Sequence, residues 1–451
     1  MSNFTGTEAL RFPKGFIFGA ATAAYQIEGA ASEDGRTRSI WDTFSHEPGR
    51  VKGGDTGDVA CNHYHRWAED LDILASLGAQ AYRFSIAWSR IFPDASGRLN
   101  DPGLDFYDRL IDGCIERGLK AFPTLYHWDM PQWLFNQGGW QNPDSARLFA
   151  HYAHCVAERL GDRVEALTTF NEPWCSAVLG HLYGIHAPGV RDLGQALTVA
   201  HGQHVAHGLA VQSIRQVRPS LPTGITLNVH AIKPATESED DSKAAERQKD
   251  FHNRLYLDPL FEGQYPASII EELSHYLPDK WEDDLPTINQ PLDFWGLNYY
   301  TPMYVEHDAN ASSAFPNARV FDPPDVPRTD FGWQIQPEAF SDLLLELNKR
   351  YALPPCYITE NGAAYNDQPV NGVVADQRRI SYMDSHLQQL RRAMDMDVNV
   401  KGYFAWSLMD NFEWAEGYSM RFGLVHVDFQ TQDRTLKNSA HWYREMIAFQ
   451  N

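Results

Sequence analysis

The chain has 451 residues, a length that suits either two average domains or one α/β barrel with long insertions. Its formal charge of −21 repels phosphate backbones and anionic lipid, which argues against nucleic acid or a membrane surface as partner. The sequence has no apolar run of about 18 residues and no secretory signal pattern at its start, so we expect a cytoplasmic protein. Five scattered cysteines without a CxxC pair favour reduced thiols over a disulfide framework or a zinc site.

Short apolar, β-rich segments alternate with helical patterns along the chain. The candidate strands are 16–21, 81–86, 121–126, 166–170, 224–229, 294–298, 356–359 and 402–407. Several are nearly continuous apolar runs, which is typical of parallel strands covered on both faces. Helical stretches between them include 67–77, 104–117, 146–160, 194–217 and 377–394. This alternation predicts an α/β fold, a single (β/α)8 TIM barrel with extended loops at its C-terminal face, in one catalytic domain over residues 1–451.

Two polar insertions interrupt the alternation. Residues 233–250 are predicted to form a solvated helical excursion, and residues 306–330, rich in Pro, Asp and Asn, a long loop on the barrel rim. His201, His204 and His207 recur every three residues, but their helix follows the fourth strand and lies away from the strand ends. We therefore expect structural histidines and no metal site. No phosphate-loop or dinucleotide spacing follows a strand, and we expect no cofactor.

A glutamate stands at the end of two candidate strands. Glu172 follows the fourth strand and precedes Pro173, which cannot extend a β-ladder. Glu360 ends the seventh strand and is followed two residues later by Gly362, which permits a sharp turn. In an eight-strand barrel, chemistry is carried at the C-terminal ends of the strands, so both side chains are expected at the mouth.

The fourth and seventh strands lie three apart around the ring, and their glutamates can converge across it. Two carboxyls about 5–5.5 Å apart are the geometry of retaining glycoside hydrolysis. One attacks the anomeric carbon, while the other protonates the leaving oxygen and then activates water. The alternative is two ordinary strand-end glutamates, which the pairing on matching strands makes a poor explanation.

A series of ordered segments extends this pattern through the chain. They are residues 16–29 (FIFGAATAAYQIEG), 82–90 (YRFSIAWSR), 126–131 (YHWDMP), both glutamate motifs, 296–300 (GLNYY) and 406–414 (WSLMDNFEW). In these segments the sequence closely resembles glycoside hydrolase family 1, which contains β-glucosidases and 6-phospho-β-glycosidases. The resemblance implies a retaining, exo-acting β-glucosidase with β-galactosidase or β-fucosidase side activity. Its expected substrates are small β-glycosides or cello-oligosaccharides.

The resemblance also implies catalytic roles. Glu360 corresponds to the nucleophile and Glu172 to the acid/base, with Asn171 holding the sugar 2-hydroxyl. Arg83 and Tyr300 are expected to hydrogen-bond Glu360, and the cationic Arg83 favours the ionised carboxylate that a nucleophile requires. Glu172 must begin protonated, in a drier or more negative environment. This division predicts a bell-shaped pH profile.

Further residues of this sequence match the family's substrate-binding positions. For the terminal sugar these are Gln26, His127, Trp128, Asn171, Asn298, Tyr300, Glu413 and Trp414, with Trp406 as the stacking floor beneath the ring. On the leaving-group side, Trp174, His186, Asn228 and Trp333 are candidates. Such a site discriminates against sugars that lack or invert a hydroxyl.

Two alternative functions remain at this point. One is a non-hydrolytic sugar-binding barrel, which the retention of both glutamates disfavours. The other is a 6-phospho-β-glycosidase, and Glu413 argues against it because the phospho-specific branch has Ser there, followed by a Lys and a Tyr. Residues 415–421 contain no Lys, although Tyr418 and Arg421 are present. We expect Arg421 to be structural and the bound sugar to carry no phosphate.

Overall fold

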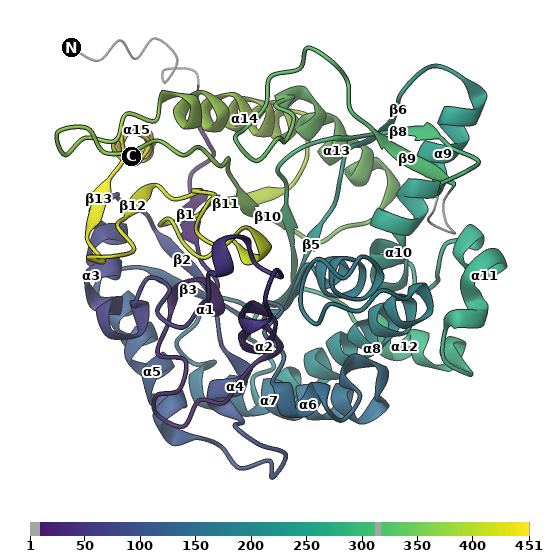
Figure 1. Cartoon of the computed structure of the whole chain (residues 1–451), viewed down its shortest axis with the longest axis horizontal. Helices are drawn as coiled ribbons and strands as arrows, with labels where there is room; N and C mark the ends of the chain where they lie inside the picture. The colour runs from purple at the N-terminus through teal and green to yellow at the C-terminus, as the bar shows by residue number, and fades with distance from the viewer. Residues whose placement is uncertain (1–9, 312–316, 451) are drawn as a thin grey trace.

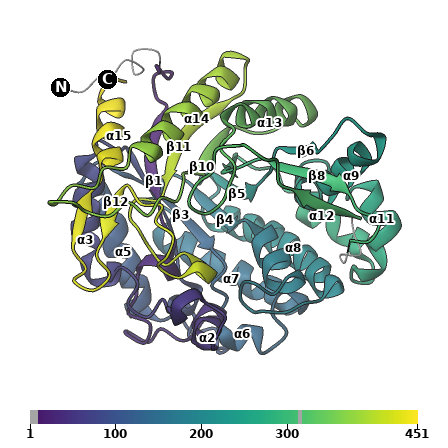
Figure 2. The same ribbon diagram turned by 45° about the horizontal axis from the view of Figure 1, so that its top comes forward.

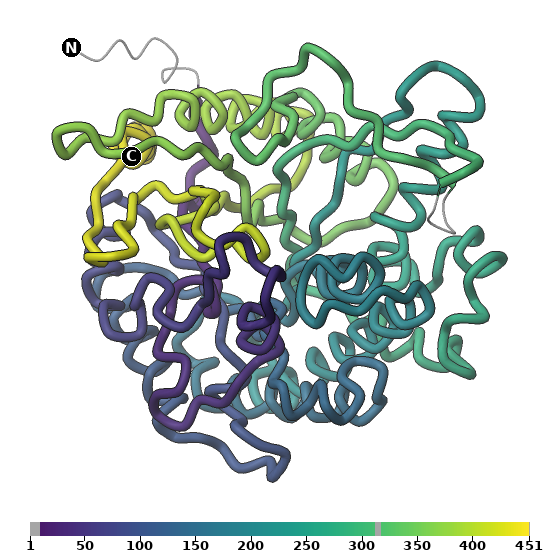
Figure 3. Tube along the Cα trace, viewed as in Figure 1, coloured from purple at the N-terminus to yellow at the C-terminus, as the bar shows by residue number. Residues whose placement is uncertain are grey.

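Eight parallel strands close into a barrel in the computed structural model, which describes residues 10–311 and 317–450 (Figure 1). Around the ring they are β1 (Ile17–Ala21), β2 (Ala81–Ser85), β3 (Lys120–Tyr126), β4 (Leu167–Asn171), β5 (Thr223–Asn228), β7 (Phe294–Asn298), β10 (Cys356–Asn361) and β11 (Val400–Trp406). The first and last strands pair to close the ring, and Figure 3 shows the purple and yellow ends of the chain side by side there. The predicted (β/α)8 barrel and all eight predicted strands are confirmed.

Helices cover the outside of the barrel (Figures 1 and 2). None in the described part of the chain combines the length and apolar character needed to cross a membrane. The α-helices of the described residues are α1 (Ala24–Ile27), α2 (Ile40–His46), α3 (His63–Ser76), α4 (Trp88–Ile91), α5 (Asp101–Glu116), α6 (Gln132–Phe135), α7 (Pro143–Leu160), α8 (Leu193–Val217), α9 (Glu239–Lys249), α10 (Leu255–Phe261), α11 (Ala267–Leu273), α12 (Leu285–Ile288), α13 (Pro337–Arg350), α14 (Gln377–Asp395) and α15 (Asn438–Ala448). The predicted helical stretches correspond to α3, α5, α7, α8 and α14.

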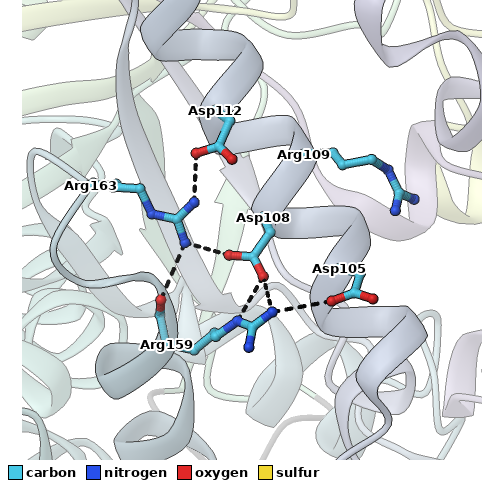
Figure 4. Close-up of a pocket in the computed structure, with 6 residues that line it drawn as sticks. All are labelled: Asp105, Asp108, Arg109, Asp112, Arg159 and Arg163. Carbon is cyan, nitrogen blue, oxygen red and sulfur yellow. Dashed lines mark hydrogen bonds and ion pairs between the residues drawn. The ribbon is translucent and has the colours of Figure 1, made fainter.

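The facing surfaces of α5 and α7 carry a cluster of opposite charges around a shallow depression (Figure 4). Arg159 lies 2.6 Å from the Asp108 carboxylate and 3.2 Å from that of Asp105. Arg163 pairs with Asp108 and, at 2.6 Å, with Asp112. Asp105, Asp108 and Asp112 are three and four residues apart and lie on one face of α5, whereas Arg159 is in the last turn of α7 and Arg163 follows that helix. The cluster links α5 with the end of α7 on the outer wall, away from the C-terminal ends of the strands.

The two polar insertions meet at one edge of the molecule (Figure 2). The first contains the predicted helix, α9, which covers a small sheet of β6 (Ile232–Pro234), β8 (Met303–His307) and β9 (Ala318–Phe321). The prediction of a plain loop over 306–330 is wrong in part, because β8 and β9 form an antiparallel pair there. Its strands are only partly covered, with Val320 64% exposed, so they lack a strong apolar signal. Residues 312–316 lie outside the described residues. A second hairpin pairs β12 (Val425–Val427) with β13 (Arg434–Leu436).

The interior of the barrel changes character along the strands. In the interior, Phe122 in the first half of β3 contacts Tyr357 in the first half of β10 and Phe404 on β11, with ring centroids 5.5 and 5.1 Å apart. These strands are not all neighbours in the ring, so the contacts cross the interior. Toward the C-terminal ends the buried side chains become polar, as with Arg83 on β2 and Asn298 on β7. An aromatic floor therefore lies beneath a polar mouth.

Candidate active site

A cavity of about 400 Å³ opens at the C-terminal ends of the strands, within the size range of small-molecule sites. Most of the site residues predicted from the sequence line it: His127, Trp128, Glu172, Trp174, His186, Asn228, Asn298, Tyr300, Trp333, Glu360, Trp406, Glu413 and Trp414. Gln26, Arg83 and Asn171 do not line it. They are almost completely buried and contact the lining residues from behind.

Glu172 follows β4 directly, and its backbone φ is 45°. Its Oε1 accepts a hydrogen bond of 2.6 Å from Asn298 Nδ2, and its Oε2 accepts one of 3.0 Å from the thiol of Cys175. Trp128 and Trp414, on the same cavity, also have positive φ, at 78° and 49°. Residues with a Cβ seldom adopt this conformation, and such strain is concentrated at functional sites. The chain is thus bent sharply around the cavity mouth.

Glu360 lies near the end of β10 with both carboxylate oxygens occupied. Arg83 Nη1 donates to Oε1 at 2.6 Å, and the Tyr300 hydroxyl donates to Oε2 at 2.7 Å. Both hydrogen bonds expected from the sequence are present. Gly362 has a different role from the predicted sharp turn, because a Cβ there would collide with the backbone carbonyl of Trp406. Glycine at this position lets β10 and β11 approach closely beside Glu360.

Burial and charge divide the two carboxyls into different protonation states. Burial, followed by the nearby charge of Glu360, raises the pKa of Glu172 to about 7. Burial also raises the pKa of Glu360, but there Arg83 opposes it most strongly, assisted by Tyr300. The negative charge therefore resides on Glu360, which has the cation in contact, and the proton on Glu172. This is the division that acid/base catalysis beside a nucleophile requires.

Asn171 connects these groups from behind the cavity wall. Its Oδ1 accepts from Arg83 Nη2 at 2.6 Å and from Asn298 Nδ2 at 2.9 Å, and its Nδ2 donates to His127 Nε2 at 3.1 Å. Burial and the charge of Arg83 hold the pKa of His127 well below its usual range. In the neutral ring the proton then lies on Nδ1, which has no hydrogen-bond partner among the described residues. His127 can therefore offer a donor to a ligand.

Glu413 also lines the mouth, and the buried Gln26 contacts it from behind. Gln26 Nε2 donates to the carbonyl of Phe412 at 2.9 Å and contacts Glu413 Oε2 at 3.5 Å, while its Oε1 has no partner in the described part of the chain. Burial, then the charges of Glu360 and Glu172, raise the pKa of Glu413 well above its ordinary value. A third carboxyl of this kind can accept or donate hydrogen bonds to hydroxyl groups.

Stacked rings form the walls between these polar groups. The ring of His127 lies 5.9 Å from those of Trp406 and Trp414, with interplanar angles of 21° and 19°. Trp128 packs against Trp414 at 4.5 Å. Flat apolar faces next to hydrogen-bonding edges suit a pyranose ring, which has C–H faces and hydroxyls around its rim.

Aromatic side chains also line the outer part of the cavity. Trp174 packs on His252 at 4.2 Å, and Trp333 on Phe331 at 4.4 Å. Burial lowers the pKa of His186 to about 3, which keeps its ring neutral. The sequence analysis did not identify several lining residues here: Cys175, His230, His252, Met303 and Phe331. Cys175 and His230 stand close to predicted residues in sequence, but His252 and Phe331 come from insertions that show no comparable spacing signal.

The histidines of α8 are engaged within the protein. His201 and His204 contact the Tyr265 hydroxyl at 2.9 and 3.1 Å, and His207 contacts Thr169 Oγ1 at 2.7 Å. Within residues 10–311 and 317–450, no group of three or more His, Cys, Asp or Glu side chains is arranged to hold a metal ion.

Comparison with known proteins gives matches along almost the whole chain. The model of glycosyl hydrolase family 1 matches residues 8–451. The β-glucosidase of Agrobacterium sp. is 52% identical over 442 residues, covering 98% of this chain and 96% of its own length. The bifunctional β-D-glucosidase/β-D-fucosidase of Bifidobacterium breve is 44% identical over 460 residues, covering 97% of this chain and 98% of its own.

Solved structures agree with these matches. Virulence factor SghA of Agrobacterium tumefaciens, in complex with its substrate analogue salicin, superposes with a TM-score of 0.97 at 52% identity, covering 99% of each chain. The family 1 β-glucosidase of Thermotoga maritima superposes with a TM-score of 0.94 at 47% identity, covering 97% of this chain and 98% of that one.

Proposed function

This chain belongs to glycosyl hydrolase family 1, and on that premise we propose that it is an exo-acting β-glucosidase. It would hydrolyse terminal non-reducing β-D-glucosyl residues of small glycosides by a retaining mechanism. The observation that carries the proposal is the pairing of Glu172 and Glu360 in one buried cavity, the first protonated and the second held ionised by Arg83. The β-glucosidase names of the relatives support the same activity.

In the first step, the Glu360 carboxylate attacks the anomeric carbon while Glu172 gives its proton to the departing glycosidic oxygen. The glycosyl–oxygen bond breaks, and a covalent glycosyl ester forms on Glu360. Arg83 and Tyr300 hold the nucleophile's two oxygens, which leaves its orientation fixed before substrate arrives. The leaving alcohol exits past the outer aromatic wall.

In the second step, Glu172 has lost its proton and acts as the base. It removes a proton from water, which attacks the anomeric carbon and releases Glu360. Once Glu360 is esterified it no longer carries the charge that raises the pKa of Glu172, which favours the ionised form of Glu172 at this stage. Two inversions leave the sugar with its original β configuration.

The mouth favours an unphosphorylated sugar. Arg421 is engaged elsewhere, because its Nη1 donates to Asp410 Oδ2 at 2.8 Å and to the carbonyl of Val427 at 2.9 Å. The Tyr418 hydroxyl donates to the carbonyl of Thr56 at 2.7 Å. The cavity wall presents Glu413 where a phosphate would need a cation. These contacts support the glucosidase proposal over the 6-phospho-β-glycosidase alternative.

Other details of the proposal rest on particular observations. The fucosidase activity in the name of the B. breve relative supports a β-fucosidase side activity, and the salicin complex of SghA supports glycosides with aromatic leaving groups as substrates. Cello-oligosaccharides remain a further proposed substrate. All five cysteines are buried free thiols, which supports action in a reducing compartment such as the cytoplasm.

One experiment tests activity and stereochemistry together. The enzyme is given nitrophenyl β-glucoside, β-galactoside, β-fucoside and β-glucoside 6-phosphate, and initial rates are compared. Proton NMR of the first product from the glucoside should show the β-anomer before mutarotation. Initial formation of the α-anomer would show an inverting mechanism, and absence of hydrolysis of all four would reject the glycosidase proposal.

A further inference from the structure

Cys175 lies one helical turn beyond Glu172, as the first residue of the π-helix η4 (Cys175–Leu182). Its side chain lines the cavity and is 5% exposed. The thiol donates to Glu172 Oε2 at 3.0 Å, and the backbone N–H of Cys175 donates to the Glu172 carbonyl at 2.9 Å. Both the main chain and the side chain of Glu172 are thus tied to this residue.

A second contact orients the thiol. Asn228, at the end of β5 on the leaving-group side, donates from Nδ2 to Cys175 Sγ at 3.7 Å. A thiol has one weak donor and a weakly accepting sulfur. With a donor approaching the sulfur from Asn228, the S–H bond is free to point toward Glu172. Two successive hydrogen bonds therefore run from the Asn228 amide to the Cys175 sulfur and from the Cys175 thiol to the Glu172 carboxyl.

The other oxygen of Glu172 is held by a group of fixed polarity. Asn298 Nδ2 donates to Oε1 at 2.6 Å, and Asn298 Oδ1 already accepts from Thr359 Oγ1 at 2.7 Å, which fixes the amide orientation. An amide nitrogen can only donate, whereas a thiol can donate to a carboxylate or accept from a protonated carboxyl. Cys175 is therefore compatible with both states through which an acid/base cycles.

We propose that Cys175 is a positioning residue for Glu172, which it holds in the orientation for proton transfer and whose ionised form it stabilises, with Asn228 orienting the thiol. This inference rests on the proposed role of Glu172 as acid/base. Cys175 acts through the Glu172 carboxyl and takes no part in bond formation at the sugar.

The electrostatics of the pair agree with this role. The hydrogen bond from the thiol opposes the rise that burial imposes on the pKa of Glu172. Burial and the charge of Glu172 raise the pKa of the Cys175 thiol well above its ordinary value. The thiol therefore keeps its proton available for donation and is a poor nucleophile, which argues against a redox or covalent role.

Cys175→Thr and Cys175→Val form a matched pair, because the two side chains have nearly the same shape and only Thr keeps a hydrogen-bonding group. The pH dependence of kcat/KM for 4-nitrophenyl β-glucoside is measured for both and for the parent. Loss of the donor in Cys175→Val should move the basic limb to higher pH by about half a unit, since the ionised form of Glu172 loses a stabilising contact. In Cys175→Thr, the basic limb should stay at the parental pH or move to a slightly lower pH.

The leaving-group dependence gives a second readout. Cys175→Val should lose more activity on alkyl glucosides than on dinitrophenyl glucoside, which needs no proton, while Cys175→Thr should preserve the parental ratio. Cys114→Val replaces a buried thiol on α5 and is the control for the cost of altering the core. The pH profile of kcat/KM for Cys114→Val should match that of the parent.

The outcomes separate the two proposals. If the parent hydrolyses the glucoside but the Thr and Val variants share one basic limb and one leaving-group ratio, the role of Cys175 is rejected and the proposed function stands. If the parent does not hydrolyse it, the proposed function itself fails. Should the β-branched variants not fold, Cys175→Ser and Cys175→Ala repeat the comparison with the same expected order.

Discussion

Replacing Arg83 removes the cation that holds Glu360 ionised. Arg83 Nη1 lies 2.6 Å from Glu360 Oε1, and both side chains are buried. At about 4 Å between charge centres and an effective dielectric constant of about 20, the attraction is about 4 kcal/mol. Because about 1.4 kcal/mol corresponds to one pH unit, complete loss would raise the pKa of Glu360 by about 3 units. Water entering the vacated space would reduce this, so we expect about 2 units for Arg83→Met.

The assay is the pH dependence of kcat/KM for 4-nitrophenyl β-glucoside. The acid limb, which reports ionisation of Glu360, should move upward by about 2 units in Arg83→Met and approach the basic limb set by Glu172 near pH 7. Where the two limbs coincide, the fraction with ionised Glu360 and protonated Glu172 falls to about one third, so maximal kcat/KM should drop at least about threefold. Arg83→Lys keeps the charge and should move the limb less. An unmoved acid limb in a correctly folded Arg83→Met would refute the assignment.

Three further predictions concern the acid/base, the sugar and the loop beside it. Glu172→Ala should lose about 10²–10⁴-fold on substrates with poor leaving groups, and azide should rescue it with formation of the β-glucosyl azide; the α-azide would reverse the assigned roles. Nitrophenyl β-glucoside 6-phosphate should have a kcat/KM at least about 100-fold below that of the glucoside, because the described cavity lining has no Lys or Arg to compensate a desolvated dianion. A preference for the phosphorylated substrate would contradict this prediction. Lys437 is fully buried and donates to Asp410 Oδ1 at 2.6 Å. Lys437→Met should lower the free energy of unfolding by about 3 kcal/mol in denaturant titrations, since it leaves Asp410 undercompensated; unchanged stability would show that Arg421 alone suffices.

The barrel was predictable because its strands are buried on both faces, so that several of them appear as nearly continuous apolar runs in the sequence, and because helical patterns alternate with them. The neighbourhood of Glu172 and Glu360 was predictable for a related reason, since the ends of parallel strands meet at one mouth. The hairpin of β8 and β9 was not predictable, because its half-exposed strands pair through backbone groups and leave no apolar pattern in the sequence.

Contacts between distant segments also escaped prediction. The collision that requires Gly362 involves the carbonyl of Trp406, and the packing of His252 on Trp174 joins an insertion to a strand end. Cys175 lies only one helical turn from Glu172 in the sequence, but only the structure shows that its thiol hydrogen-bonds the Glu172 carboxyl. Residue type and spacing indicate which side chains gather at a barrel mouth, while their hydrogen-bond partners depend on how the loops fold over it.

Covalent capture of the glycosyl-enzyme tests the central claim most directly. A 2-deoxy-2-fluoro-β-glucoside with a dinitrophenyl leaving group slows both steps but still allows the first, so the intermediate should accumulate. Mass spectrometry of the intact protein should show the addition of one fluoroglucosyl group, and peptide sequencing should place it on Glu360. Attachment to another residue would contradict the assigned nucleophile, and release of the leaving group without any adduct would contradict the double-displacement mechanism.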